Sequence, residues 1–301
     1  MKLKQTLIGT FIGLLGLTGL VAVEAENNRP NIVIMLADDM GTVGLGCYGS
    51  PNKGASPNID RLAEQGMRFR NMFVSAATCA PVRAELYTGY MPERNGCNRN
   101  HCATTKASKS IVHYLEDLGY RVGLAGKSHV HPTSVYPFQD VKGVQGKATF
   151  KNSGPDDWEP SRTFMASNQE QPFCLVVGSI HPHAPWDSGD ASQWKNKELV
   201  LPKSFVDTAV TRDKFRHFLA EVKMFDKQVG AVEKQLRELG LEENTAIIIL
   251  GENGIGMPGG KWSTFDLGLR SACIIKWPGG ESGTTDAIAH YCDILPTLIE
   301  G

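Results

Sequence analysis

Carboxylate and amide side chains follow two apolar runs that have the character of buried strands. Asp38 and Asp39 come after the run NIVIML, and Glu252 and Asn253 come after the run TAIIIL. In an open α/β sheet the ligand site lies beyond the carboxyl ends of the strands, so we expect these side chains to meet. Oxygen ligands suit a hard divalent cation, Ca²⁺ or Mg²⁺. Asp and Gly also form ordinary turns, so one such cluster alone would indicate only a turn. Two clusters at two strand ends favour a metal site.

A second group of reactive side chains lies in the run CAPVR, which begins at Cys79. Pro81 suits the first turn of a helix, which would place Cys79 at a helix N-terminus, where free N–H groups favour an anion. Arg83 follows one helical turn later on the same face. The alternative is a capped helix with a buried structural cysteine. The chain holds seven cysteines, an odd number, so one of them could be chemically distinct.

The run continues AELYTG, and together the two segments resemble the sulfatase signature, Cys-x-Pro-x-Arg followed by Leu-x-Thr-Gly. The resemblance extends over residues 29–301. It implies an α/β fold of the alkaline-phosphatase-like type. It also implies that Cys79 is oxidised after translation to formylglycine, an aldehyde whose hydrate is the nucleophile. That conversion would account for the odd cysteine.

Further segments match the family in chain order, among them Gly-Lys-Ser-His, Pro-His-Ala-Pro and Gly-Glu-Asn-Gly. The catalytic residues implied by the resemblance are Cys79, Arg83, Lys127, His129, His183 and Lys261. The implied metal ligands are Asp38, Asp39, Cys79, Glu252 and Asn253. The neighbouring histidines His131 and His181 are weaker candidates for substrate contact.

The resemblance also implies roles. Asp39 would accept a proton from the nucleophile, and His183 or Lys261 would protonate the leaving group. His129 would deprotonate the second hydroxyl of the aldehyde hydrate. Glu252 stands where the family usually has Asp, so its carboxylate reaches one methylene further. The stretch GKSHV, followed by VYPF, is similar to the heparan N-sulfatase (sulfamidase) branch.

The predicted function is hydrolysis of a sulfuric ester or N-sulfate, with a sulfated small molecule or glycan as substrate. A formylglycine-generating enzyme would be a maturation partner. A phosphodiesterase or phosphonate monoester hydrolase of the same superfamily is one alternative. A non-catalytic exported protein that binds sulfated glycans is another. The net charge of −1 argues against a nucleic-acid partner.

The N-terminus has the pattern of an export signal over residues 1–25. Lys2 and Lys4 precede the apolar run Leu7–Val23, and Val-Glu-Ala supplies a cleavage site. An uncleaved membrane anchor is the alternative. We therefore expect a periplasmic or secreted protein, without stable membrane insertion after cleavage, whose catalytic domain occupies residues 26–301. The resemblance implies that the family's smaller C-terminal subdomain is missing from this chain.

Strands alternate with helices along the chain, which predicts an α/β protein with a central, mainly parallel sheet flanked by helices. The expected strands are Asn31–Leu36, Phe69–Ser75, Arg121–Ala125, Phe173–Ile180, Thr245–Leu250 and Ala272–Trp277. The expected helices begin at Pro57, Pro81, Ser108 and Arg212 and end near Gly66, Tyr87, Leu118 and Leu239. Residues 131–172 read as a long surface connection. Cys97 and Cys102 are close enough in sequence to form a disulfide.

Overall fold

A computed structural model describes residues 29–144 and 156–301, and the predicted signal segment 1–25 lies outside these residues. One sheet of eight strands runs through the described chain in the order β4-β3-β5-β1-β6-β7-β2-β8. The strands are β1 (Asn31–Leu36), β2 (Met67–Phe73), β3 (Arg121–Gly126), β4 (Gln139–Val141), β5 (Phe173–Gly178), β6 (Thr245–Leu250), β7 (Arg270–Lys276) and β8 (Gly283–His290).

The sheet is mainly parallel, as the sequence predicts. Only β7 runs antiparallel to its two neighbours, and every other pairing is parallel. All six residues of β1, β5 and β6 are buried, as expected for strands covered on both faces. Leu36 at the end of β1 pairs with Gly178 of β5 and Leu250 of β6. The chain therefore leaves these three strands at the same edge of the sheet.

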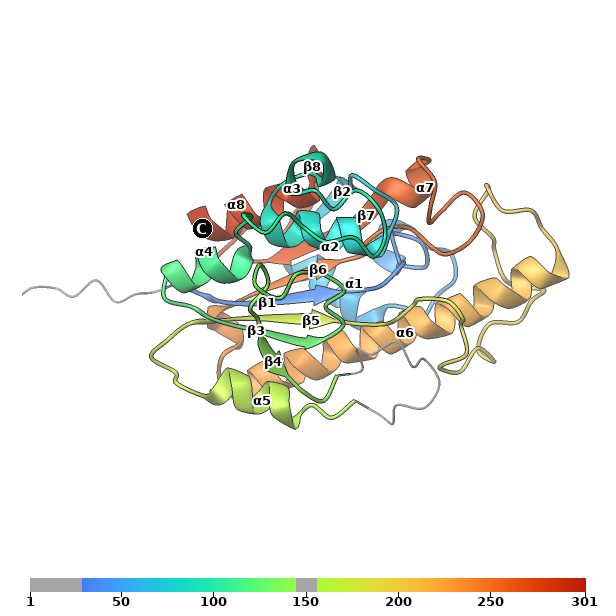
Figure 1. The fold of residues 1–301 in the computed structure, drawn as a ribbon. Helices are drawn as coiled ribbons and strands as arrows, with labels where there is room; N and C mark the ends of the chain where they lie inside the picture. The colour runs from blue at the N-terminus through green and yellow to red at the C-terminus, as the bar shows by residue number, and fades with distance from the viewer. Residues whose placement is uncertain (1–28, 145–155) are drawn as a thin grey trace, which may run out of the picture.

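Helices cover both faces of the sheet (Figure 1). On one face lie α1 (Pro57–Gln65), α5 (Glu159–Ala166) and α6 (Ala209–Glu238). On the other lie α2 (Cys79–Thr88), α4 (Ile111–Asp117) and α8 (Ile294–Glu300). The short helices α3 (Pro92–Asn95) and α7 (Asp266–Leu269) connect neighbouring elements, and three 3₁₀ helices complete the set: η1 (Gly46–Tyr48), η2 (Glu242–Asn244) and η3 (Tyr291–Asp293).

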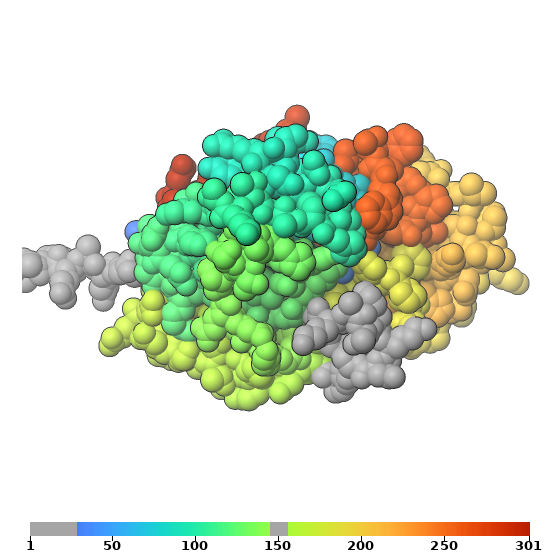
Figure 2. All heavy atoms as spheres, viewed as in Figure 1, coloured from blue at the N-terminus to red at the C-terminus, as the bar shows by residue number. Residues whose placement is uncertain are grey.

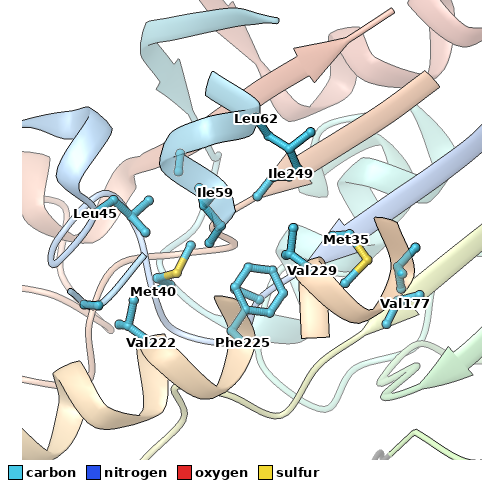
Figure 3. Packing of buried hydrophobic residues seen from close by; sticks show 14 of the residues in the cluster. Met35, Met40, Leu45, Ile59, Leu62, Val177, Val222, Phe225, Val229 and Ile249 are labelled. Carbon is cyan, nitrogen blue, oxygen red and sulfur yellow. The ribbon is translucent and has the colours of Figure 1, made fainter. Parts of the chain in front are cut away.

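The long helix α6 is fixed against the sheet by a large apolar cluster (Figure 3). Met35 of β1 and Ile249 of β6 share this cluster with Phe225 and Val229 of α6, and all four are fully or almost fully buried. Apolar side chains at i, i+4 spacing on α6 face the sheet because that spacing forms one stripe of a helix. Burial of each such side chain contributes about 1.5–3 kcal/mol. Buried apolar side chains therefore hold α6 firmly against β1 and β6.

The fold class and the six predicted strands are confirmed, with ends shifted by a few residues. The interpretation of residues 131–172 as a surface connection is wrong, because they include β4 and helix α5. Both elements are short and carry few apolar residues, so they give little periodic signal. Residues 145–155 of that stretch lie outside the described residues. Strand β8 was not predicted either, since seven of its eight residues are polar, Gly or Ala.

All seven cysteines have free thiols. The predicted option of a bond between Cys97 and Cys102 is therefore not realised, although the Cys97 thiol lies 3.4 Å from the Cys102 carbonyl oxygen. Cys174 and Cys273 are buried in the apolar core, as predicted. Among the described residues no helix is both long enough and apolar enough to cross a membrane.

Candidate active site

Cys79 is the first residue of helix α2 and lies at the edge of the sheet where β1, β5 and β6 end. Its side chain is almost fully buried. The sulfur lies 3.3 Å from Asp38 Oδ1 and 3.6 Å from Asp39 Oδ1, and Lys261 Nζ approaches it to 3.2 Å. Burial raises the pKa of the Cys79 thiol well above its usual range, and the Glu252 and Asp38 carboxylates act in the same direction. An unmodified Cys79 is therefore a neutral thiol, which is a poor nucleophile.

The two metal-ligand clusters predicted from the sequence meet through an unusual backbone geometry. Asp39 and Glu252 have φ values of 62° and 55°, in the left-handed region that non-glycine residues seldom adopt. The Asp39 N–H donates to Glu252 Oε2 at 3.1 Å, and the Met40 and Gly41 N–H groups donate to the Gly251 carbonyl. These bonds join the loops after β1 and β6. Strained backbone held in this way is typical of functional sites.

Arg83 lies on α2 behind Cys79 and is completely buried. Its Nε donates to Glu252 Oε1 at 2.5 Å, and its two terminal nitrogens donate to the carbonyls of Lys127 and Ala37. Burial opposes the charged form of Arg83, but Glu252 and Asp38 together hold its pKa above the usual value. Arg83 therefore ties α2 to the ends of β1, β3 and β6, and it is absent from the described lining of the cavity.

The two lysines are each paired with one of the aspartates. Lys127 Nζ lies 2.5 Å from Asp38 Oδ2, and Lys261 Nζ lies 2.7 Å from Asp39 Oδ2. Burial alone would lower the pKa of both lysines, but the facing carboxylates raise it instead. Burial acts to raise the pKa of Asp38, but Lys127 with Arg83 holds that pKa below its usual value. Asp38 and both lysines are therefore charged at neutral pH.

The histidines separate into two groups. His183 Nε2 lies 3.1 Å from Lys261 Nζ and 3.4 Å from Asp39 Oδ2, beside the nucleophile position. His129 instead contacts His101, with His129 Nε2 and His101 Nδ1 2.8 Å apart. Burial, together with Lys127 and Arg83, lowers the pKa of His129 to about 3, so that its ring is neutral.

The two weaker candidates for substrate contact, His131 and His181, differ in their position relative to the cavity. His131 lines the cavity. His181 does not belong to the described lining, because its Nδ1 is paired with the buried Glu221 of α6 at 3.0 Å.

Cys79, Asp39, the two lysines and four of these histidines line a cavity of about 930 Å³. On the surface in Figure 2, the stretch near residue 100 (teal) and the stretch near residue 260 (orange) meet above the residues near 185 (yellow). The lining residues are Asp39, Cys79, Asn100, His101, Lys127, Ser128, His129, His131, His183, Ala184, Gly256, Met257, Pro258, Lys261 and Trp262. A cavity of this volume admits a ligand of the size of one or two sugar units.

The residues present fit a divalent cation. Ligand atoms of Asp38, Asp39, Cys79 and His183 all lie within 4.8 Å of one another. Asn253 donates from Nδ2 to Asp39 Oδ1 at 2.9 Å, whereas its Oδ1 is buried and has no hydrogen-bond partner among the described residues. A buried acceptor without a partner is costly, and a cation would satisfy it. Carboxylate and amide oxygens favour Ca²⁺ or Mg²⁺.

Sequence reasoning placed most of the site but missed part of its rim. Of the predicted residues, Asp39, Cys79, Lys127, His129, His183 and Lys261 line the cavity. The other four, Asp38, Arg83, Glu252 and Asn253, are buried and hydrogen-bonded to residues of that lining. Asn100 and His101 line the cavity and were not predicted. They lie in an irregular loop after α3, where no periodicity or recognised motif marks them. The only available signal was two polar residues that follow the signature helix.

The sulfatase family model matches residues 30–300. The chain belongs to the sulfatase family. An "Ulvan-active sulfatase" of Formosa agariphila is 33% identical over 287 residues, which cover 92% of this chain and 55% of that relative. The human "N-sulphoglucosamine sulphohydrolase" is 26% identical, over 90% of this chain and 61% of that relative. The chain thus spans little more than half of the length of these relatives.

Solved structures of other proteins have the same fold. The phosphonate monoester hydrolase of Agrobacterium radiobacter superposes with a TM-score of 0.74 at 18% identity, over 90% of this chain and 73% of that chain. A likeness at this identity establishes the fold and leaves the reaction to be argued from the site. The resemblance to sulfatases inferred from the signature is confirmed.

Proposed function

We propose that this protein hydrolyses sulfate esters or N-sulfates of glycans, with formylglycine formed at Cys79 as the nucleophile. The observation that carries the proposal is the position of Cys79, at the start of a helix and between two aspartates and Lys261, in a cavity large enough for sugars. The names of the two sulfatase relatives support the substrate class.

The charges of the site support binding of an anionic group. Three buried carboxylates, Asp38, Asp39 and Glu252, face three cations, and each carboxylate has one cationic partner within 2.7 Å. The protein groups alone are therefore close to neutral. With a divalent cation held by the aspartates, Lys127 and Lys261 would be free to bind a sulfate group. Fixed cations of this kind stabilise the negative charge that grows on the sulfate oxygens in the transition state.

The proposed proton transfers use groups that already contact one another. Asp39 lies beside Cys79 and can accept the proton of a hydroxyl at that position. His183 and Lys261 lie 3.1 Å apart and form the pair from which the leaving oxygen or nitrogen receives a proton. Asp38, Asp39 and Asn253 would hold the metal, with Glu252 as the further predicted ligand. The metal and the aldehyde hydrate, when present, supply a polarised sulfate and an activated hydroxyl.

The experiment is mass spectrometry of the tryptic peptide Asn71–Arg83, combined with hydrolysis of 4-nitrophenyl sulfate. We expect the mass change of thiol-to-aldehyde conversion at Cys79 in protein produced with a formylglycine-generating enzyme. We also expect turnover that Cys79→Ala abolishes without changing the unfolding temperature. Full activity of Cys79→Ala would overturn the proposed nucleophile.

Two competing functions are outcomes of the same assay. Faster turnover of a phosphonate monoester or phosphodiester than of 4-nitrophenyl sulfate would assign the site to the phosphonate hydrolase class. Converted protein without turnover of either ester would favour a non-catalytic sulfated-glycan-binding protein.

The sequence also supports a proposal for the cellular location and maturation of the enzyme. We propose export to the periplasm or the medium through residues 1–25, and maturation by a formylglycine-generating partner. Both are checked by sequencing the N-terminus of the secreted protein and by expression with and without that partner.

A further inference from the structure

A second cavity of about 570 Å³ adjoins the active-site cavity. The two cavities share four lining residues: Ala184, Gly256, Met257 and Pro258. A Cβ placed on Gly256 would lie 3.8 Å from Trp186 of the second cavity and 3.9 Å from Asp39 Oδ2 of the first. Ala184 and Gly256, two of the smallest residues, thus form part of the boundary between the two cavities. Gly256 is close to Asp39 of the first cavity and to Trp186 of the second.

The second cavity is lined by a lysine that forms no salt bridge in the described structure. Lys214 of α6 is exposed and has no ion-pair partner within residues 29–144 and 156–301. The neighbouring Asp213 is already paired with Arg216 at 2.6 Å, so it does not compensate Lys214. His217, one turn further along α6, also lines the cavity. An occupant of this cavity therefore meets the Lys214 ammonium group, the Asp213 carboxylate already paired with Arg216, and the His217 imidazole.

An aromatic ring in the same cavity is held rigidly. Trp186 donates from its indole N–H to the Pro182 carbonyl at 2.7 Å, and its ring packs edge-on against Phe218 at 5.8 Å. A fixed, half-buried indole offers apolar surface to a sugar ring at little cost in conformational entropy. Ammonium, imidazole and indole groups together form a lining suited to an anionic sugar.

We propose that the second cavity binds the sugar unit next to the one whose sulfate is cleaved, and that Lys214 selects for a carboxylate or sulfate on that unit. The proposal rests on the proposed sulfatase function. It assigns specificity to a surface outside the signature motifs.

The test is inhibition of 4-nitrophenyl sulfate hydrolysis by glycosaminoglycan disaccharides. One set carries a uronate next to the sulfated sugar, a second set carries a second sulfate there, and a third set has a neutral neighbour. Lys214→Ala should raise the inhibition constants of the charged sets about tenfold, the usual effect of losing one charge-assisted contact. It should leave the neutral set and the aryl sulfate kinetics unchanged. The set that responds identifies the anion.

The matched control is Lys227→Ala, an exposed lysine of α6 outside both cavities, which should change no constant. Equal inhibition of Lys214→Ala and unmodified protein overturns the proposal, as does the absence of inhibition by every charged disaccharide. Failure to hydrolyse 4-nitrophenyl sulfate at all would instead count against the proposed function.

An independent observation concerns the proton on His129. The Ala80 N–H donates to Asn100 Oδ1 at 3.3 Å, which identifies the other atom of that amide as Nδ2, a donor. Asn100 Nδ2 lies 3.3 Å from His101 Nε2, so His101 Nε2 must accept and His101 Nδ1 must carry the proton. His101 Nδ1 in turn faces His129 Nε2 at 2.8 Å.

We infer that Asn100 and His101 hold His129 in the tautomer that carries its proton on Nδ1. In the described structure that nitrogen is buried and has no partner. With Nδ1 protonated and Nε2 accepting from His101, the resting His129 has no ring nitrogen free to accept a proton, whereas the family resemblance implied a base. Asn100 and His101 are positioning residues, because they act through His129.

Two-bond ¹⁵N–¹H NMR of histidine-labelled protein reports the tautomer directly. We expect a proton on Nδ1 of His129 in the unmodified protein, and its transfer to Nε2 in a large fraction of molecules in His101→Phe. His131→Phe is the matched control, because His131 lines the same cavity but takes part in the described hydrogen bonds only through its backbone carbonyl. A proton on Nε2 of His129 in the unmodified protein, or no change in His101→Phe, overturns the inference.

Discussion

At the scale of single residues, the Arg83–Glu252 pair explains how a charged site is built inside an apolar sheet. Both side chains are completely buried, and Glu252 uses one oxygen for Arg83 and the other for the Asp39 backbone. Burial raises the pKa of Glu252, and Arg83 opposes that rise. The longer reach of Glu compared with Asp lets one carboxylate join α2 to the loop after β1.

Glu252→Gln should therefore destabilise the fold. The substitution leaves Arg83 as a buried charge without its main partner, and losses of this kind amount to about 3–5 kcal/mol. The free energy of unfolding in urea measures the effect. Glu198→Gln is the control, because that carboxylate forms an exposed pair with Lys195, which is worth less than about 1 kcal/mol. Equal losses in the two variants would contradict the argument.

The sequence predicted those site residues that belong to a motif or directly follow a strand. Asp38, Cys79, Lys127 and Lys261 were predicted because the spacing of strand ends and signature segments marks them. His101 was not, because its role depends on a loop that returns to the cavity, and nothing local in the sequence encodes that return. The pairing of Arg83 with Glu252 was also missed, since the two residues lie 169 positions apart.

At the scale of elements, α6 fixes the start of α1 through one buried carboxylate. Asp226 accepts hydrogen bonds from the Asn58 and Ile59 N–H groups, both at 2.9 Å, and from the Asn58 side chain. It thereby satisfies free N–H groups in the first turn of α1. Burial raises the pKa of Asp226 to about 6, although these hydrogen bonds oppose the rise.

The raised pKa predicts a definite pH dependence. Between pH of about 4 and 6 the folded chain keeps a proton on Asp226 that the unfolded chain has lost, so this group's contribution to stability decreases as pH rises. The shift corresponds to about 3 kcal/mol. Asp226→Asn should remove this loss. Urea unfolding of both proteins at pH 4 and pH 7 gives the difference, with Asp117→Asn as an exposed control. The same pH slope in both proteins would refute the prediction.

The elements themselves were predictable to different degrees. Strands β1, β5 and β6 are continuous apolar runs, and their burial on both faces requires such runs. Strand β8 contains Gly, Thr and Asp, is mostly exposed, and exists because its backbone pairs with β2. A strand of that kind is stabilised by a partner distant in sequence, so its own residues give no periodic signal.

At the scale of the whole molecule, α2 and the loops after β1, β3 and β6 bring six charged side chains into one cluster, beside the buried Asn253 Oδ1 that has no hydrogen-bond partner among the described residues. Two of its cations, Lys127 and Lys261, compensate the aspartates directly. The fold therefore tolerates the cluster without a metal, and it gains stability when a divalent cation binds. Binding to the folded state alone stabilises a protein by about 2.7 kcal/mol at a ligand concentration 100 times the Kd.

Cation binding to the folded state predicts a metal-dependent stability. Ca²⁺ or Mg²⁺ at millimolar concentration should raise the unfolding temperature of the unmodified protein, chelation should reverse the rise, and KCl of equal ionic strength should not reproduce it. Asn253→Ala should reduce the rise, because it removes the buried Oδ1 that has no other partner in the described structure. Asn168→Ala, at an exposed position far from the cluster, should leave it unchanged. An equal rise in both variants would show that the cation stabilises the fold at a different place. Because the measurement needs neither formylglycine nor substrate, it tests the cation site separately from catalysis.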